Sequence, residues 1–274
     1  MSTAIFRADA GSFAFESSDD RAAELATLHH QATVATQLEL DIWQRLGLRP
    51  GHKVVDLSCG PGVITCELAR HVMPTPVVGI DSCRELLGHA ERYRARKGLG
   101  NARFQFGNVN QLDLPEDTFD FAYARFLFQE LADAPAAIEN IMRVLRPGGI
   151  LCAVDVDENW LSLEPCEDAF LELSKLVALG NNAAAGDRYI GHRLGGLFHA
   201  AGLEQIETNI VPITTNDIGV PAFLQIATGG KLKQVPSEYQ SRAEELLREL
   251  HAMLDATHAW GAAGIFVASA RKPA

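Results

Sequence analysis

Polar side chains follow four of the apolar stretches in the first half of the chain. They are Asp56, Asp81, Asn108 and Arg125. A carboxylate accepts hydrogen bonds from hydroxyl or ammonium groups, and an amide both donates and accepts. If each apolar stretch is a strand of one open parallel sheet, the four side chains meet at its carboxyl edge, where such sheets bind ligands. The pattern therefore indicates a site for a polar cosubstrate.

A glycine-containing turn connects the first of these stretches to a helix. The turn is Ser58-Cys59-Gly60-Pro61-Gly62, and residues 63–70 have apolar side chains at helical spacing. Glycine lets the backbone approach a ligand, and a helix start offers free N–H groups. Asp81 lies about 20 residues after the turn, near the spacing at which an acid accepts from ribose hydroxyls. An ordinary strand-to-helix connection has the same form, so the turn alone does not identify a ligand.

The elements that position these residues alternate between strand and helix. The predicted strands are 52–57, 76–80, 102–107, 119–124 and 150–155, and the predicted helices are 63–72, 83–97 and 133–145. Such alternation implies right-handed crossovers and a largely parallel sheet with both faces covered. Residues 21–46 carry an apolar stripe at helical spacing, which predicts one or two helices before the sheet.

The regular alternation stops after Asp157. The predicted elements are helices over 165–180 and 191–201, strands over 203–213 and 264–271, and a helical block over 219–258. Two late strands separated by a long helical excursion predict an edge hairpin with an inserted lid.

Composition and charge exclude several classes of protein. The chain has 274 residues and a formal net charge of -11, which argues against tight non-specific binding of nucleic acid. The five cysteines include no C-x-x-C pair, which favours reduced thiols in the cytoplasm. The N-terminus has no basic and apolar leader pattern, and the chain has no run of about 18 apolar residues, so we expect no membrane insertion.

Four motifs together resemble one family. They are VVDLSCGPG at the turn, GID at 79–81, FQFGNVNQLDLPEDTFDFAYARF at 104–126 and RVLRPGGIL at 143–151. The chain resembles the class I S-adenosylmethionine-dependent methyltransferases, in particular the small-molecule branch that includes quinone-biosynthesis and natural-product enzymes. The resemblance implies an α/β, Rossmann-like, seven-stranded, mostly parallel sheet with an antiparallel C-terminal hairpin strand and an inserted helical cap.

The expected organisation is a single domain over residues 1–274. Its core is expected at about 46–158, 199–213 and 259–274, and its cap at about 1–45, 159–190 and 214–258. The implied cosubstrate is S-adenosyl-L-methionine, with S-adenosyl-L-homocysteine as the product.

The resemblance also implies roles for individual residues. The turn should pass under the methionine part, Asp56 should face its ammonium group, and Asp81 should bind ribose, with Ser82 beside it. Asn108 and Val109 should flank adenine, Arg125 should lie along the cosubstrate, and Gln31 belongs to a helix that closes over the site. The full set implied to bind the cosubstrate is Gln31, Asp56, Ser58, Cys59, Gly60, Gly62, Asp81, Ser82, Asn108, Val109 and Arg125.

Two residues depart from the pattern of the family. Ser58 stands where glycine is usual, and serine costs more than glycine if the backbone has a positive φ angle. Asn108 stands where aspartate is usual, and its oxygen can still accept from an adenine amino group.

The catalytic residues are less defined than the cosubstrate site. Asp155, His192 and His30 are candidates for a general base, and each also suits an ordinary structural or surface role. Methyl transfer requires a base only where the acceptor must lose a proton. His251 and His258 share one helical face, but no acid or cysteine completes a set of metal ligands, so we predict no metal site.

The sequence therefore predicts transfer of a methyl group from S-adenosylmethionine to O, N or C of a small, fairly apolar metabolite. A nicotinamide oxidoreductase is disfavoured because Thr65 occupies the third glycine position of G-x-G-x-x-G. The alternative is an S-adenosylmethionine-binding fold with a non-methylating catalytic role or a role as a partner subunit. The expected partner is a small-molecule acceptor, a homodimer is left open, and secondary metabolism in the cytoplasm is the expected setting.

Overall fold

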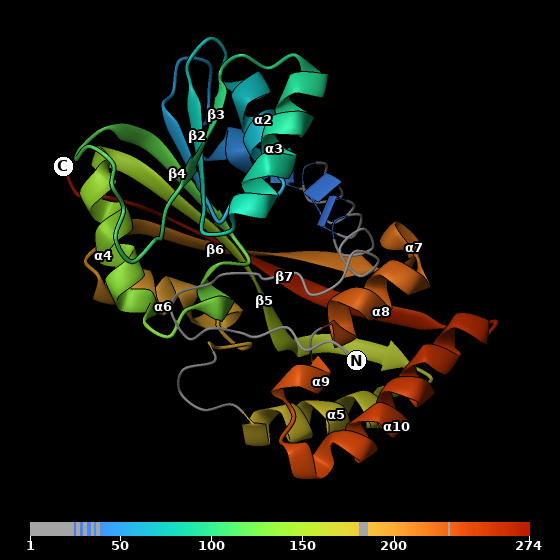
Figure 1. Ribbon diagram of the computed structural model, residues 1–274. Helices are drawn as coiled ribbons and strands as arrows, with labels where there is room; N and C mark the ends of the chain where they lie inside the picture. The colour runs from blue at the N-terminus through green and yellow to red at the C-terminus, as the bar shows by residue number, and fades with distance from the viewer. Residues whose placement is uncertain are drawn as a thin grey trace.

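The computed structural model describes residues 39–180, 186–229 and 231–274, together with residues 25, 28, 29, 32, 33 and 36. These residues form a mixed sheet of seven strands with helices on both faces (Figure 1). The strand order is β3-β2-β1-β4-β5-β7-β6. β7 is antiparallel to β5 and β6, and the remaining neighbours are parallel. The predicted fold class is confirmed.

Most predicted elements are present within about two residues of their expected bounds. The strands are β1 (Val54–Leu57), β2 (Val77–Asp81), β3 (Ala102–Phe106), β4 (Phe119–Arg125), β5 (Leu145–Glu164), β6 (Glu204–Thr214) and β7 (Trp260–Arg271). The α-helices of the described residues are α2 (Val63–His71), α3 (Arg84–Lys97), α4 (Ala134–Val144), α5 (Glu167–Gly180), α6 (Leu194–Ala200), α7 (Thr215–Ile218), α8 (Val220–Thr228), α9 (Lys231–Gln234) and α10 (Gln240–His251). Short 3-10 turns are η1 (Phe128–Glu130), η2 (Gly191–Arg193), η3 (Ser237–Tyr239) and η4 (Ala252–Asp255). Described residues between 25 and 45 are helical as well.

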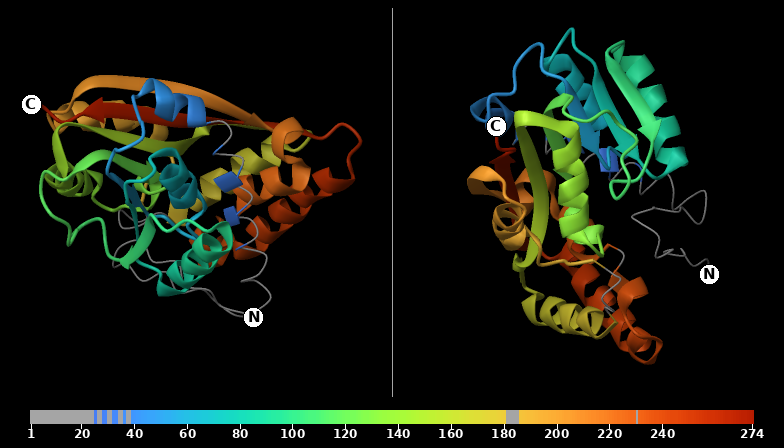
Figure 2. Two further views of the ribbon diagram at one scale, coloured as in Figure 1. Left: turned by 90° about the horizontal axis from the view of Figure 1, so that it is seen from above. Right: turned by 90° about the vertical axis from the view of Figure 1, so that its left-hand side faces the viewer.

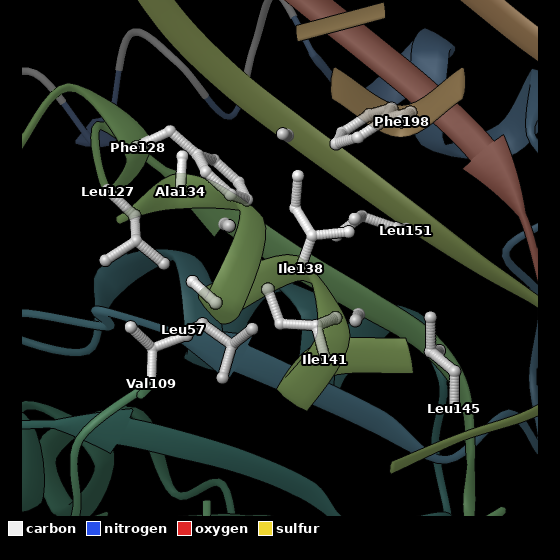
Figure 3. Packing of buried hydrophobic residues seen from close by; sticks show 14 of the residues in the cluster. Leu57, Val109, Leu127, Phe128, Ala134, Ile138, Ile141, Leu145, Leu151 and Phe198 are labelled. Carbon is white, nitrogen blue, oxygen red and sulfur yellow. The ribbon is translucent and has the colours of Figure 1, made fainter. Parts of the chain in front are cut away.

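One face of the sheet is covered by α4 and α6. Asp133 begins α4 by accepting the N–H of Ala136 at 3.0 Å, and this bond satisfies one of the free donors of the first turn. Ile138 and Ile141 then lie one helical turn apart and pack against the sheet (Figure 3). Phe198 of α6 lies beside them in the same buried cluster and meets Phe128 edge to face. This layer fixes the loop after β4, because Phe128 belongs to η1.

The opposite face is covered by α2 and by the helical residues 39–45. Trp43 is fully buried and contacts Tyr123 of β4 edge to face, with ring centroids 5.5 Å apart. Ile42 belongs to the same buried cluster, as does Leu68 of α2. The segment before the sheet is therefore anchored to the core at this end.

The predicted end of the fifth strand at Asp155 is wrong, because β5 continues to Glu164. β7 likewise begins at Trp260 rather than at residue 264, and the two strands stay paired through Leu163 and Gly261. The pairing shifts register between Val156 and Leu161. Beyond that irregularity β5 and β7 continue as a ribbon, and β6 pairs with β7 there as far as Thr214 and Ala262.

The ribbon carries the cap. Leu163 is fully buried against a separate apolar cluster to which α5, α8 and α10 contribute, for example Phe170, Phe223 and Leu246. Figures 1 and 2 show these helices gathered beyond one end of the sheet. No helix among the residues that the structure describes has the length and apolar character needed to cross a bilayer.

Candidate functional site

The turn between β1 and α2 has a left-handed backbone at three positions. The φ angle is 60° at Ser58, 53° at Gly60 and 76° at Gly62. Gly62 is required by space as well, since an added Cβ would lie 2.6 Å from the Cβ of Ala90 and from Cζ of Phe104. Space is open at Gly60. The exposed Ser58 therefore adopts the positive φ at which serine costs more than glycine.

Asp81 holds this turn against the end of β2. Its Oδ2 accepts the N–H of Gly60 at 2.8 Å, and its Oδ1 accepts the N–H of Cys83 at 2.8 Å. The N–H of Cys59 is bonded to the carbonyl of Ile80 at 3.0 Å. Burial raises the pKa of Asp81, while bonds from the N–H groups of Cys83, Gly60 and Ser82 lower it. Because each carboxylate oxygen has two lone pairs, Asp81 can still accept from a ligand.

Asp56 lies at the third position of β1 and is almost fully buried. Its Oδ2 accepts the hydroxyl of Thr65 at 2.5 Å. Burial, with the charges of Asp81 and Glu39, raises its pKa to about 7, although the hydrogen bond from Thr65 lowers it. Without a cation nearby, ionisation of Asp56 is opposed both by its low-dielectric surroundings and by two neighbouring acids. The site therefore favours a positively charged group beside Asp56.

Glu39 lies beside the candidate site residues Asp56 and Arg125, and the sequence analysis did not single it out. It is buried, with 2% of its surface exposed, and its carboxylate accepts the hydroxyl of Tyr123 and Nε of Arg125, the latter at 3.1 Å. The guanidinium of Arg125 also stacks on Phe126, with Cζ 3.8 Å from the ring centroid. A signal was present in the sequence, because Glu39 is an acid at helical spacing before the apolar Ile42 and Trp43.

Asn108 and Val109 lie in the loop after β3. The side-chain oxygen of Asn108 accepts the N–H of Asn110 at 2.9 Å, which forms a tight turn. Val109 is buried beside Leu57 and Leu127 (Figure 3). The side chain of Val109 thus belongs to the core. Only its backbone is left for the contact with adenine that the family resemblance implies.

Asp155 is directed toward the loop after β4. Its Oδ2 accepts the N–H groups of Phe128 at 2.9 Å and of Gln129 at 3.3 Å. Burial raises its pKa to about 8 although these bonds lower it. Asp155 therefore fixes the position of η1 relative to β5.

His192 forms a pair with Asp157 rather than with Asp155. Its Nδ1 contacts the carboxylate of Asp157, whose side chain is fully buried, while about half of the His192 side chain is exposed. Asp157 also accepts the N–H of Asn159 at 3.0 Å. A buried carboxylate on Nδ1 orients the imidazole and leaves Nε2 to exchange a proton.

The structure therefore joins the turn, Asp56 and Asp81 directly, and it links Arg125 to them through Glu39. Asp157 lies farther along β5, and His192 lies beside it in η2. Gln31 and His30 lie outside the described residues. Within the part of the chain that is described, no three histidine, cysteine, aspartate or glutamate side chains form a group suited to a metal ion.

Sequence comparison identifies the family to which this arrangement corresponds. The profile of the family described as "Methyltransferase domain" matches residues 48–202. The demethylmenaquinone methyltransferase of Geobacillus stearothermophilus is 29% identical over 43% of this chain and 51% of its own length. The trans-aconitate 2-methyltransferase of Deinococcus radiodurans is 37% identical over 40% of both chains. The chain thus spans about half or less of the length of these curated relatives.

Solved structures share the fold at low identity. The YcgJ protein of Bacillus subtilis has a TM-score of 0.59 at 19% identity, and the match covers 90% of this chain and all of that one. The [4+2]-cyclase SpnF has a TM-score of 0.56 at 20% identity, with 89% of this chain and 81% of that one covered. A protein named as a cyclase therefore has this fold as well.

The strained backbone at Ser58 yields a prediction about stability. Replacing Ser58 with glycine should raise the free energy of unfolding by about 0.5–1 kcal/mol. Removing the strain of the left-handed backbone stabilises the folded protein by more than the added entropy of glycine stabilises the unfolded chain. Urea denaturation of the two proteins measures the difference. Gly60→Ala is the matched control and should lower the free energy of unfolding. Its added Cβ meets no neighbouring atom, so the only effect on the folded state is the cost of a positive φ angle for alanine. A Ser58→Gly protein no more stable than the parent contradicts the interpretation.

Proposed function

Because the chain belongs to the methyltransferase-domain family, we propose that it moves a methyl group from S-adenosylmethionine to O, N or C of a small, fairly apolar metabolite. S-adenosylhomocysteine is then the second product. The observation that carries the proposal is the buried acidic site made by Asp56, Asp81 and Glu39 beside a glycine turn. Such a site suits a ligand that bears cationic groups and a ribose diol.

The residues present fit S-adenosylmethionine. Asp56 faces the methionine ammonium group, whose charge relieves the repulsion among the acids. Asp81 accepts from the ribose hydroxyls with its remaining lone pairs while it keeps its bonds to Gly60 and Cys83. Asn108 and the backbone of Val109 flank adenine. When bound, the cosubstrate supplies an activated methyl group, and the protein contributes alignment and exclusion of water.

His192 is the group we propose for removing a proton from the acceptor. Asp157 orients its ring and stabilises the imidazolium that forms. Asp155 is less suited to this task because its carboxylate is taken up by the N–H groups of η1.

The acceptor is proposed from the relatives and from the cap. The two relatives are named for a quinone precursor and for a small carboxylic acid. The apolar cap on the β5–β7 ribbon suits a fairly apolar molecule of this size range. All five cysteines are unpaired, which favours a reducing cytoplasm, and fractionation of cells that express the protein checks this location.

Binding of S-adenosylhomocysteine tests the proposed cosubstrate. The protein should bind it in calorimetry, and Asp81→Ala should weaken binding by about 1–3 kcal/mol through loss of the ribose hydrogen bonds. Asp113→Ala, which removes an exposed carboxylate elsewhere, is the matched control and should bind as the parent does. Equal affinities for the parent and Asp81→Ala would remove Asp81 from the site.

Transfer of a labelled methyl group tests the reaction itself. Pools of candidate acceptors incubated with labelled S-adenosylmethionine should yield a labelled product. If the protein binds S-adenosylhomocysteine but no acceptor is ever labelled, the alternative of a non-methylating role takes its place. The fold alone accommodates that alternative, since a [4+2]-cyclase shares it.

The raised pKa of Asp56 predicts how cosubstrate binding depends on pH. Below about pH 7 the carboxyl group of the free protein is protonated and cannot pair with the ammonium group. Affinity for S-adenosylhomocysteine should therefore fall by up to about tenfold per pH unit below 7 and level off above it. Calorimetry between about pH 5.5 and 7.5 measures the slope. Asp56→Asn should bind more weakly and lose most of the slope; an unchanged slope would assign it to another group.

The pairing of His192 with Asp157 predicts a kinetic effect. With a hydroxyl acceptor found by the labelling experiment, His192→Gln should lower kcat by about 100-fold or more. Binding of S-adenosylhomocysteine should not change, because His192 does not contact the turn or the acids of that site. Asp157→Asn should also lower kcat and shift the pH profile. Full activity of His192→Gln would show that no proton is transferred to this side chain.

A further inference from the structure

One face of the β5–β7 ribbon is apolar and open to solvent. The cap covers the other face, where Leu163 and Ala263 belong to the cluster of the cap helices. Side chains alternate between the two faces of a strand, and residues paired across strands share a face, so the neighbours of Leu163 and Ala263 point away from the cap. We call this second side the open ribbon face; it consists of Trp160, Ser162, Ile210, Pro212, Trp260 and Ala262.

Two tryptophans dominate the exposed surface of the open ribbon face. Trp160 is 53% exposed and Trp260 is 42% exposed, and Ile210 of the edge strand β6 is 41% exposed. The two indole side chains together leave roughly 200 Å² of mostly apolar surface in contact with water. Apolar residues scattered singly over a surface are common, but a contiguous patch marks a surface that binds something.

Neighbouring residues hold Trp160 in place without covering it. A Cβ added at Gly264 would lie 3.1 Å from Cβ of Trp160 and 3.3 Å from its Cε3, so the side chain lies directly over this glycine. The indole also meets the buried Phe266 edge to face, with ring centroids 5.6 Å apart. A side chain that is already fixed loses little conformational entropy when a partner binds to it.

The open ribbon face carries no charge in a strongly acidic chain. The formal net charge is -11, so two copies repel each other unless the surfaces that meet are free of acids. None of the six residues of the face is charged, and Glu164 lies only at its outer end, paired with Trp260. A strongly charged partner would find no complementary charge here, whereas a second copy of the same face meets no repulsion.

The layout of the face suits a two-fold axis. Ser162 pairs with Ala262, and a tryptophan lies two residues before each of them, Trp160 on β5 and Trp260 on the antiparallel β7. The tryptophans therefore lie about 7 Å to either side of this pair of small residues. A two-fold axis that crosses the strands at Ser162 and Ala262 places Trp160 of one copy against Trp260 of the other, and the same contact recurs on the other side of the axis.

We propose that the open ribbon face binds the same face of a second copy of this chain, so that Trp160 of each copy packs on Trp260 of the other. This inference goes beyond the proposed function and does not depend on it. An interface at the low end of the stable range takes about 600 Å² from each copy, of which the two tryptophans supply about a third. We expect dissociation in the micromolar range.

The molar mass in solution tests the dimer. Light scattering at tens of micromolar protein should give twice the 29.7 kDa of one chain, and the mass should fall on dilution. Trp43 is fully buried, so a red shift of the tryptophan emission on dilution reports Trp160 and Trp260. Trp160→Ala and Trp260→Ala should each weaken dimerisation at least tenfold. Leu179→Ala, which removes an apolar side chain of α5 that is 63% exposed, is the matched control and should not.

Opposite charges at the axis identify the face that is used. A residue at a two-fold axis faces its own counterpart, so Ser162→Glu and Ser162→Lys should each be monomeric. An equimolar mixture of the two variants should recover the dimer, because unlike charges then meet. Thermal melting shows that each variant is folded, and the two tryptophan variants decide the question if either serine variant is not.

A parent protein that stays monomeric at the highest concentration reached overturns the inference, and so does a dimer that persists unchanged in Ser162→Glu. A monomeric parent whose tryptophan emission shifts to the blue with phosphatidylcholine vesicles would assign the face to a membrane surface and overturn it as well. Affinity for S-adenosylhomocysteine is measured on the same samples, so a failure of the cosubstrate site is read separately.

Discussion

The site depends on one carboxylate that two segments of backbone share. Asp81 ends β2, and its oxygens accept the N–H groups of Gly60 in the turn and of Cys83 before α3. These bonds fix the glycine-containing turn and the start of α3 to the same strand end. A buried carboxylate left without them would carry a large desolvation cost, so the turn and the acid stabilise each other. Everything proposed for the methionine and ribose parts relies on this arrangement.

The acids around the turn are costly in isolation. Asp56 is buried beside the charges of Asp81 and Glu39, and within the described part of the chain only Glu39 of these three acids is paired with a base, Arg125. The buried apolar clusters on both faces of the sheet offset the free-energy cost of burying these acids, because they hold the strands in place. A ligand with positive charge recovers part of it. The repulsion among these acids therefore lowers the stability of the unliganded protein and raises its affinity for a cationic ligand.

The sequence predicted that Asp81 and the turn lie together, but not the contacts of Glu39 or the partner of His192. Asp81 and the turn are close in sequence and follow a regular alternation, so spacing alone located them. Glu39 and Tyr123 are far apart in the chain and meet only through tertiary packing. The pairing of His192 with Asp157 is equally non-local. The sequence predicts a strand end at Asp155, whereas Glu158 and Asn159 lie in an irregularity within a longer strand.

The ribbon of β5 and β7 has a consequence for how this architecture can diversify. The excursion that contains α7 to α10 leaves β6 after Thr214 and returns at Trp260, and Thr214 pairs with Ala262, two residues farther on. Its two ends are thus neighbours on adjacent strands. An insertion with adjoining ends can lengthen, shorten or be exchanged at little entropic cost to the sheet that bears it. The part of the cap that contains α7 to α10 can therefore be exchanged in evolution, while α5 and the strand ends that hold Asp56 and Asp81 stay unchanged.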